Sequence, residues 1–194
     1  MIDLYAWTSA NGRRPIIMLE ETETPYRITA IDPHSEAKNT SDYRAISPGG
    51  KVPCLVDPDG PGGDAIHLME SSAILMYLGD KTGRFMGGDA SVRWDVLQWL
   101  MYQATNVAIS FSALNVTREI APQCRDLLDV LNNHLFDHDY FAAEYSIADM
   151  MSIGRFGDFR FDYIDLNDYP NVCRWRARVM ERPAVRKAME MKIV

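Results

Sequence analysis

The 194-residue chain lacks several features that define other protein classes. It has three cysteines, Cys54, Cys124 and Cys173, and no Cys-x-x-Cys pair, which argues against a zinc ribbon and against a protein dithiol. Because these cysteines are widely spaced, we expect free, buried thiols in a reducing cytoplasm. No apolar run approaches the length of a membrane span, and no basic stretch followed by an apolar core marks a signal peptide.

Positive charge is also scarce. Lys and Arg together number 20 against 27 Asp and Glu, which gives a formal net charge of −7. Nucleic acids and anionic membranes attract positive surfaces, so we expect neither as the main partner. The hydrophobic fraction of 47% and the charged fraction of 24% are ordinary for a folded soluble protein with room for two small domains.

The first eighty residues alternate between strand and helix signals. Pro15, beside an apolar run, predicts a helix start, because a proline in the first turn of a helix gives up no hydrogen bond. A second helix over residues 71–78 is expected to stop at Gly79. The resulting order, βαβ then ββα, is the thioredoxin-like arrangement, and we assign it to a domain of residues 1–80. We expect the strands at residues 2–7, 27–31, 52–56 and 65–68.

Strand signals disappear from about residue 91. We expect an all-α domain over residues 91–194, joined to the first by a polar, glycine-rich linker over residues 81–90. Ser146 to Asp149 has the form of a capping box, with aspartate in place of the usual Glu or Gln. Three- and four-residue spacing marks a common face on each of three helices. These faces are Trp94, Leu97, Met101, Ala104 and Ala108; Cys124, Leu128, Leu131 and Leu135; and Val172, Trp175 and Val179.

Two short segments of the first domain have both a functional and a plain structural interpretation. If the bond before Pro53 is cis, the backbone of Val52 faces solvent as an open edge for an extended peptide; if it is trans, the segment is an ordinary strand start. Glu70-Ser71 lies at a helix N-terminus, where an anion is favoured and Glu70 can hold an ammonium group. The same two residues can equally be a simple helix cap.

The loop from Thr8 to Gly12 precedes the first expected helix. A thiolate placed there is stabilised, because a thiol with a pKa of about 8.5 drops by one or more units at a helix N-terminus. The alternative is a capping turn, since Asn11-Gly12 is a common turn pair.

In order and spacing, these three segments resemble the glutathione transferase family. The closest likeness is to the bacterial nu-class members that act as disulfide-bond oxidoreductases, and it covers nearly the whole chain. The fold that it implies is an α/β thioredoxin-like domain followed by an all-α bundle. The matching motifs are Thr8-Ser9-Ala10-Asn11-Gly12, Pro48-Gly49-Gly50-Lys51-Val52-Pro53, Glu70-Ser71-Ser72-Ala73-Ile74-Leu75, the hairpin insertion Asp57 to Gly63, and Tyr145-Ser146-Ile147-Ala148-Asp149 in the helical half.

The resemblance implies glutathione as cofactor and a role for each matching residue. It implies that the Pro53 bond is cis, that Val52 pairs with the cysteine portion of glutathione, and that Glu70 and Ser71 hold the γ-glutamyl end. Ser9 and Asn11 are the implied catalytic residues beside the sulfur, and Thr8 is a neighbouring candidate if the loop shifts.

Two lysines complete the implied glutathione site. Lys38 stands where the subclass tends to have a glutamine, and its cation could hold the carboxylate of the glycine end. Lys51 belongs to the same binding segment as Val52.

The chain departs from the family pattern at the second-substrate site. The region from Asn106 to Gln123 is shorter than usual, and Gly154, Arg155 and Gly157 occupy a stretch where family-typical aromatics and proline are absent. We therefore expect an altered electrophile pocket.

The preferred function is a glutathione-dependent enzyme that carries out thiol–disulfide exchange or conjugates glutathione to a small electrophile. The resemblance also implies a homodimer. The alternative is a non-catalytic relative that uses the fold as an interaction module. His134 and His138 are four residues apart, but we interpret them as exposed polar residues at a helix end and expect no metal.

Overall fold

The computed structural model describes residues 1–161 and 163–193. By their contacts these residues form two compact units. The N-terminal unit comprises residues 1–82 together with the described residues after Pro183, and the helical unit comprises residues 83–183. The boundaries at residues 80 and 91 expected from the sequence stay a prediction, and positions 162 and 194 of that second domain lie outside the described residues. No helix of the described chain is both long and apolar enough to cross a membrane.

The N-terminal unit is built on a four-stranded mixed sheet with the order β2-β1-β3-β4. β1 pairs in parallel with β2 and antiparallel with β3, which pairs antiparallel with β4. The predicted thioredoxin-like order of strands and helices is confirmed, with each strand displaced by one or two residues at its ends. The strands are β1 (Ile2–Ala6), β2 (Tyr26–Ala30), β3 (Cys54–Asp57) and β4 (Ile66–Met69).

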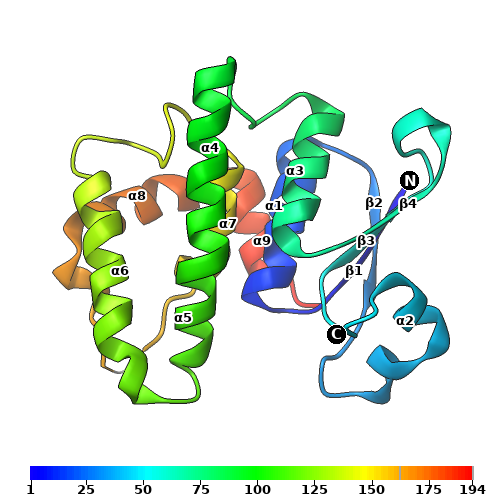
Figure 1. Cartoon of the computed structure of the whole chain (residues 1–194), viewed down its shortest axis with the longest axis horizontal. Coiled ribbons are helices and arrows are strands. Elements are labelled where there is room, and N and C mark those ends of the chain that lie inside the picture. Colours follow the sequence, from blue (N-terminus) through cyan, green and yellow to red (C-terminus); the bar gives the residue numbers. More distant parts are fainter. Residues whose placement is uncertain (162, 194) are drawn as a thin grey trace. The chain divides into compact units, whose positions relative to one another are not determined.

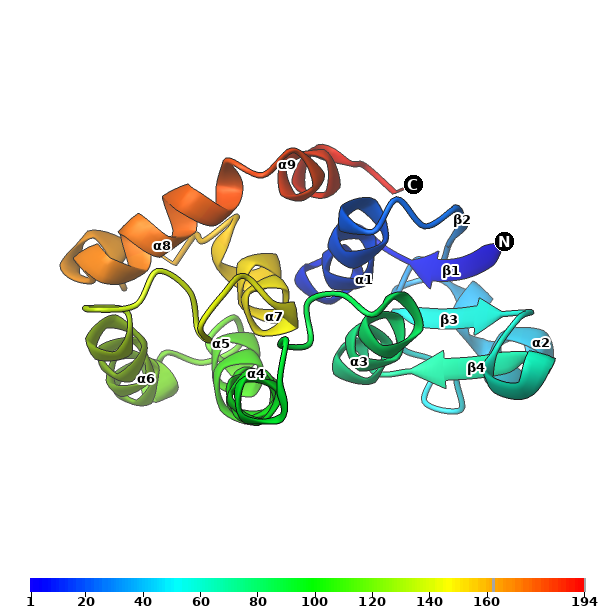
Figure 2. The same ribbon diagram turned by 90° about the horizontal axis from the view of Figure 1, so that it is seen from above.

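Helices α1 (Ala10–Glu21) and α3 (Ser71–Thr82) lie side by side on one face of this sheet (Figures 1 and 2). The predicted helix start at Pro15 is wrong, because the Ser9 side chain accepts the Gly12 amide and caps a helix that begins at Ala10. The predicted stop at Gly79 is also wrong. Gly79 is buried within α3, and the residue with the left-handed backbone that ends such a helix is Gly83, at φ +66°.

The polar stretch between β2 and β3 contains a short 3₁₀ helix (Glu36–Asn39) and helix α2 (Ser41–Ile46), which sequence patterns did not reveal. Tyr43 of α2 packs with Ile31 and Cys54 in a small buried cluster, against which Tyr5 and Val52 also pack. The predicted burial of Cys54 is confirmed, since its exposed fraction is 0%.

The helical unit is all-α, as predicted, and is filled by aromatic rings. Phe111 packs edge-on against Phe156, and Phe141 packs against Trp175 in the same manner. The segments Gln103–Val107 (a π-helical turn) and Arg118–Ile120 and Leu166–Asp168 (3₁₀ turns) join or precede its helices. The helices are α4 (Ala90–Tyr102), α5 (Ala108–Ala113), α6 (Ala121–His134), α7 (Ile147–Phe156) and α8 (Pro170–Met180).

Two of the three predicted helix faces are buried, and one is not. All of the predicted face of α6 and all of that of α8 lie in the core. On α4, however, Trp94 is 71% exposed and Met101 is 41% exposed. The stripe that packs inward is Val96, Leu100, Gln103 and Val107. Because α4 is apolar on two sides, residue spacing selected the wrong one.

The predicted capping box at α7 is confirmed. The Ser146 hydroxyl accepts the Ala148 amide at 3.3 Å, and the fully buried Asp149 carboxylate accepts the Ser146 amide at 3.0 Å. Asp149 also accepts hydrogen bonds from the Trp175 indole at 2.7 Å and from the Phe141 amide at 3.2 Å. The Asp149 carboxylate thus joins the start of α7 both to α8 and to the loop that precedes α7.

Burial raises the pKa of Asp149 to about 6, even though its hydrogen bonds favour the charged form. The folded state therefore binds the proton more tightly than the unfolded state, and this group's contribution to stability is lost as the pH rises through about 6. We expect the free energy of unfolding to fall by about 1 kcal/mol per pH unit between about pH 4.5 and 5.5 from this group alone. The free energy of unfolding, measured with urea at several pH values across that range, should change less steeply with pH for Asp149→Asn than for the wild type. The exposed control Asp129→Asn should keep the wild-type slope, and equal slopes in all three proteins would contradict the assignment.

Candidate functional site

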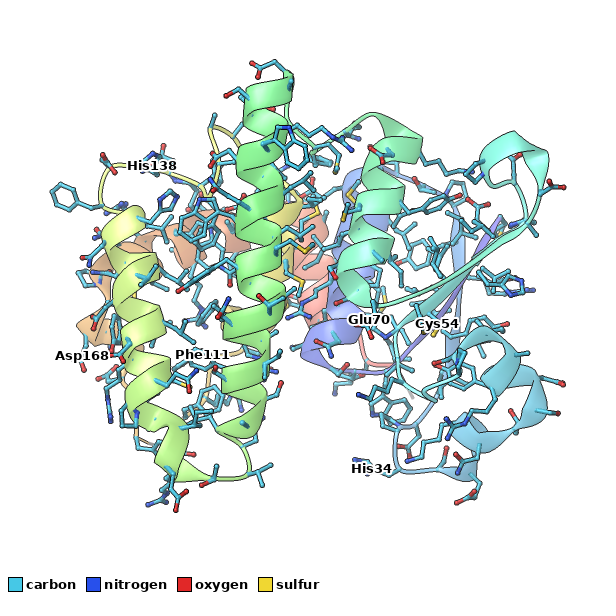
Figure 3. All side chains as sticks on the ribbon, viewed as in Figure 1. His34, Cys54, Glu70, Phe111, His138 and Asp168 are labelled. Atoms are coloured by element: carbon cyan, nitrogen blue, oxygen red, sulfur yellow. The ribbon has the colours of Figure 1, made fainter. Side chains whose placement is uncertain are left out.

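Three segments that the sequence marked meet at one end of the sheet. Tyr5, near the end of β1, lies opposite Cys54 at the start of β3, and Cys54 lies opposite Met69 at the end of β4. The loop after β1, the segment before β3 and the turn after β4 therefore converge. Figure 3 shows Glu70 and Cys54 close together at this edge. Two helices, α1 and α3, begin there and point their N-terminal amides toward it.

Ser9 caps α1 and keeps its own proton available. Its hydroxyl oxygen accepts the Gly12 amide at 3.1 Å. Within residues 1–161 and 163–193, the hydroxyl hydrogen of Ser9 has no acceptor, so it can be donated to a ligand atom at the helix end. Gly12 is required by close packing, since a Cβ there would lie 2.2 Å from the Trp7 carbonyl oxygen. Ser9 is thus a cap and a donor at once.

A buried arginine, which sequence reasoning missed, links the two helix starts. Arg14 is 2% exposed, and its Nη1 donates to Asn11 Oδ1 at 2.6 Å and to Ser71 Oγ at 3.0 Å. The structure therefore connects a residue predicted beside the ligand sulfur, Asn11, with one predicted at the γ-glutamyl end, Ser71. A guanidinium at two positive helix ends makes this edge strongly favourable for anions.

The bond between Val52 and Pro53 is cis, as the family resemblance implied. No group in the described chain hydrogen-bonds the backbone N–H or C=O of Val52. The neighbouring Lys51 carbonyl, by contrast, accepts from three groups: Tyr43 Oη at 2.7 Å, Ser47 Oγ at 3.0 Å and Cys54 Sγ at 3.4 Å. Val52 is therefore an open backbone edge on a firmly held segment.

Burial raises the pKa of Tyr43, and the neighbouring Cys54 thiol adds to that rise. The phenol therefore remains protonated and keeps donating to Lys51 at any physiological pH. Tyr43 supports the site from behind and does not line it.

Glu70 holds an unusual backbone conformation at the start of α3. Its φ is +70°, in the left-handed region that residues with a Cβ seldom adopt. Its side chain is exposed and has no partner among the described residues, while its carbonyl accepts the Ile74 amide at 3.0 Å. Such strain persists where a site requires a side chain in a fixed position.

The two lysines predicted for the site are placed differently. The Lys38 ammonium donates to the Pro33 carbonyl at 2.5 Å, so part of its hydrogen-bonding capacity is used locally. The Lys51 side chain is exposed and has no partner in the described chain. Both assignments stay predictions.

The cysteines are free, as expected. Burial raises the pKa of the Cys124 thiol and that of the Cys173 thiol, which lowers the fraction of reactive thiolate at neutral pH. Cys54 donates to the Lys51 carbonyl and is fully buried. Across the described residues, no group of three or more His, Cys, Asp or Glu side chains is arranged to hold a metal.

The strain at Glu70 generates a stability prediction. Glycine adopts positive φ without a steric penalty, so Glu70→Gly should raise the free energy of unfolding by about 1 kcal/mol. The control Glu70→Ala removes the same carboxylate but keeps a Cβ, and should bring no gain. Urea unfolding of the three proteins at neutral pH measures the difference. A Glu70→Gly protein no more stable than Glu70→Ala would contradict the strain assignment.

Comparison with known proteins agrees with this geometry. Residues 8–81 match the family model for the glutathione S-transferase N-terminal domain, and residues 115–183 match the model for the C-terminal domain. The disulfide-bond oxidoreductase YfcG of Escherichia coli (strain K12) is 33% identical over 97% of this chain and 94% of its own. The disulfide-bond oxidoreductase YghU of the same organism is 30% identical over 96% of this chain and 73% of its own.

A solved structure resembles the whole chain. The crystal structure of a glutathione transferase from Pseudomonas putida, with one glutathione disulfide bound per subunit, superposes with a TM-score of 0.89 at 29% identity, and covers 98% of this chain and 91% of that one. Both family models match this chain, and YfcG is 33% identical to it over nearly the full length. The chain belongs to the glutathione S-transferase family.

Proposed function

We propose that this protein is a glutathione-dependent enzyme that reduces disulfides by thiol–disulfide exchange with bound glutathione. The observation that carries the proposal is the open backbone edge of Val52, next to two helix N-termini that Arg14 ties together. An extended peptide with an anionic end and a thiol fits such an edge. The names of YfcG and YghU, both disulfide-bond oxidoreductases, support the same reaction.

Each part of glutathione has a matching group in this arrangement. The cysteine portion pairs with the backbone of Val52 as an added strand. The carboxylate of the γ-glutamyl end lies at the N-terminus of α3 beside Ser71, and its ammonium group pairs with Glu70. Lys38 and Lys51 are the cations within the same unit that would hold the glycine carboxylate.

The thiol then lies at the start of α1, where Ser9 donates its free proton to the sulfur and Asn11 offers its side-chain amide. The helix end and these donors favour the thiolate over the thiol. The thiolate attacks one sulfur of the substrate disulfide, a glutathione–substrate mixed disulfide forms, and the other sulfur leaves as a thiolate that takes up a proton. A second glutathione thiolate attacks the mixed disulfide, which releases the reduced substrate and glutathione disulfide.

The protein's own thiols do not enter this scheme. Cys54 and Cys124 are fully buried, and the three cysteines are free. The two electrons therefore come from two molecules of glutathione, in agreement with a related structure that holds glutathione disulfide.

A cytoplasmic homodimer is the proposed working form. Trp94, 71% exposed, and Met101, 41% exposed, form an apolar strip on α4 that the described chain leaves partly open. Such a strip favours contact with a second subunit. A reducing compartment would supply the glutathione and keep the free cysteines reduced.

Retention on immobilised glutathione tests the binding part of the proposal. Glu70→Gln and Ser71→Ala should each reduce retention at least tenfold, because each removes a partner of the γ-glutamyl end. The matched control is Glu23→Gln, which alters another glutamate with positive φ, 53°, in the same unit. Wild-type protein that passes through the resin unretained would overturn the proposal, and a fixed protein partner would then favour the interaction-module alternative.

Turnover separates the two chemistries. With glutathione present, we expect the wild-type protein to reduce 2-hydroxyethyl disulfide faster than it conjugates 1-chloro-2,4-dinitrobenzene. Ser9→Ala should lower disulfide turnover at least tenfold at neutral pH, since the sulfur loses its donor, and Ser9→Thr should restore it. The control Ser35→Ala removes a comparable cap from the 3₁₀ helix at Glu36. Conjugation without disulfide turnover would instead assign a transferase.

A further inference from the structure

A pair of hydrogen bonds ties the loop of Ser9 to residues near the end of the chain. The Thr8 hydroxyl donates to the Ile193 carbonyl at 3.1 Å and accepts the Ile193 amide at 2.7 Å, between positions 185 apart in sequence. Both the donor and the acceptor capacity of this hydroxyl are thus directed at one residue. Thr8 is therefore not available to a bound sulfur, and the earlier candidate role for its hydroxyl falls to Ser9.

Further polar contacts join the last described residues to α1 itself. Helix α9 (Pro183–Glu190) places Lys187 Nζ 2.7 Å from Glu20 Oε2, and Arg13 Nη2 donates to the Met189 carbonyl at 3.1 Å. Residue numbers rise along the chain end as they fall along α1, so the last residues run back antiparallel to the helix and finish at its cap. The contact at Thr8 is the one that reaches the site.

The segment is also anchored by burial. Val185 and Ala188 of α9 are fully buried, and Ile193 is 6% exposed. The burial of the Ile193 side chain and its two backbone hydrogen bonds to Thr8 together hold both residues in one position. The neighbouring Ser9 backbone then has little freedom, and its hydroxyl keeps one direction.

We propose that Thr8 is a positioning residue for the thiolate site, and that residues 191–193 act as a strap that holds the Thr8–Ser9 loop in its donating geometry. This inference rests on the proposed function, because it assigns the loop to the glutathione sulfur. The strap fixes the Ser9 hydroxyl at the start of α1. A donor that is free to rotate stabilises a thiolate less, so the fixed hydroxyl lowers the pKa of the thiol of bound glutathione. By reciprocity, bound glutathione thiolate also holds the strap in place.

The test is a titration of the thiol of bound glutathione, followed by the ultraviolet absorbance of the thiolate. Thr8→Val keeps the shape of the side chain and removes both hydrogen bonds. We expect the pKa of the bound thiol to rise by about one unit. Turnover should then fall about tenfold at pH values well below the wild-type pKa, with little loss well above the new pKa. Thr8→Ser retains the hydroxyl and should titrate like the wild type. The control Thr22→Val removes a threonine hydroxyl from the other end of α1, where it donates to the Met18 carbonyl.

A variant at Ile193 tests the same contact in case Thr8→Val fails to fold. Ile193→Pro removes the amide that donates to Thr8 and leaves Thr8 intact, so it should reproduce the shift in thiol pKa; Ile193→Val keeps the amide and should not. Failure of the wild-type protein to bind glutathione would refute the proposed function. Wild-type binding with unchanged titration in both Thr8→Val and Ile193→Pro would refute the strap alone.

Discussion

The carbonyl oxygen of Lys51 is the point on which the site depends. Three donors converge on it, from Tyr43, Ser47 and Cys54, and they fix the backbone immediately before Val52. Cys54 then enters β3, so the backbone after Pro53 is fixed as well. Val52 lies between these two fixed segments. Its own backbone N–H and C=O have no hydrogen-bond partner in the described chain. An edge that is open yet immobile can pair with a peptide without first losing conformational freedom.

The second constraint is that the parts of the site come from distant elements. Arg14 joins α1 to the start of α3, and the Thr8–Ile193 pair joins the cap of α1 to the chain end. A single loop could not supply both links. The sheet aligns the ends of its strands at one edge, and these two polar connections then set the side chains that lie there.

Local sequence patterns predicted much of this, and they failed where long-range contacts decide. The strand and helix order, the capping box at Asp149 and the burial of Cys54 follow from neighbours within a few residues. Arg14 was missed because an arginine in a sequence is ordinarily expected on the surface, and its burial depends on Ser71, 57 positions away. The roles proposed for Ser9 and Glu70 rest on the family resemblance, because residue spacing alone left both as helix caps.

The discontinuity of the N-terminal unit bears on how the chain is made. Helix α9 joins this unit only after residues 83–183 have been synthesised. At roughly 5–20 residues per second, the ribosome needs roughly 10–40 s to pass from Thr8 to Ile193. In the later part of that time, once the strands up to Met69 have been synthesised, a nascent chain can form its sheet and open edge but lacks the partner of Thr8. Under the strap proposal, a nascent N-terminal unit would therefore stabilise a bound thiolate less than the same unit with residues up to Ile193 in place.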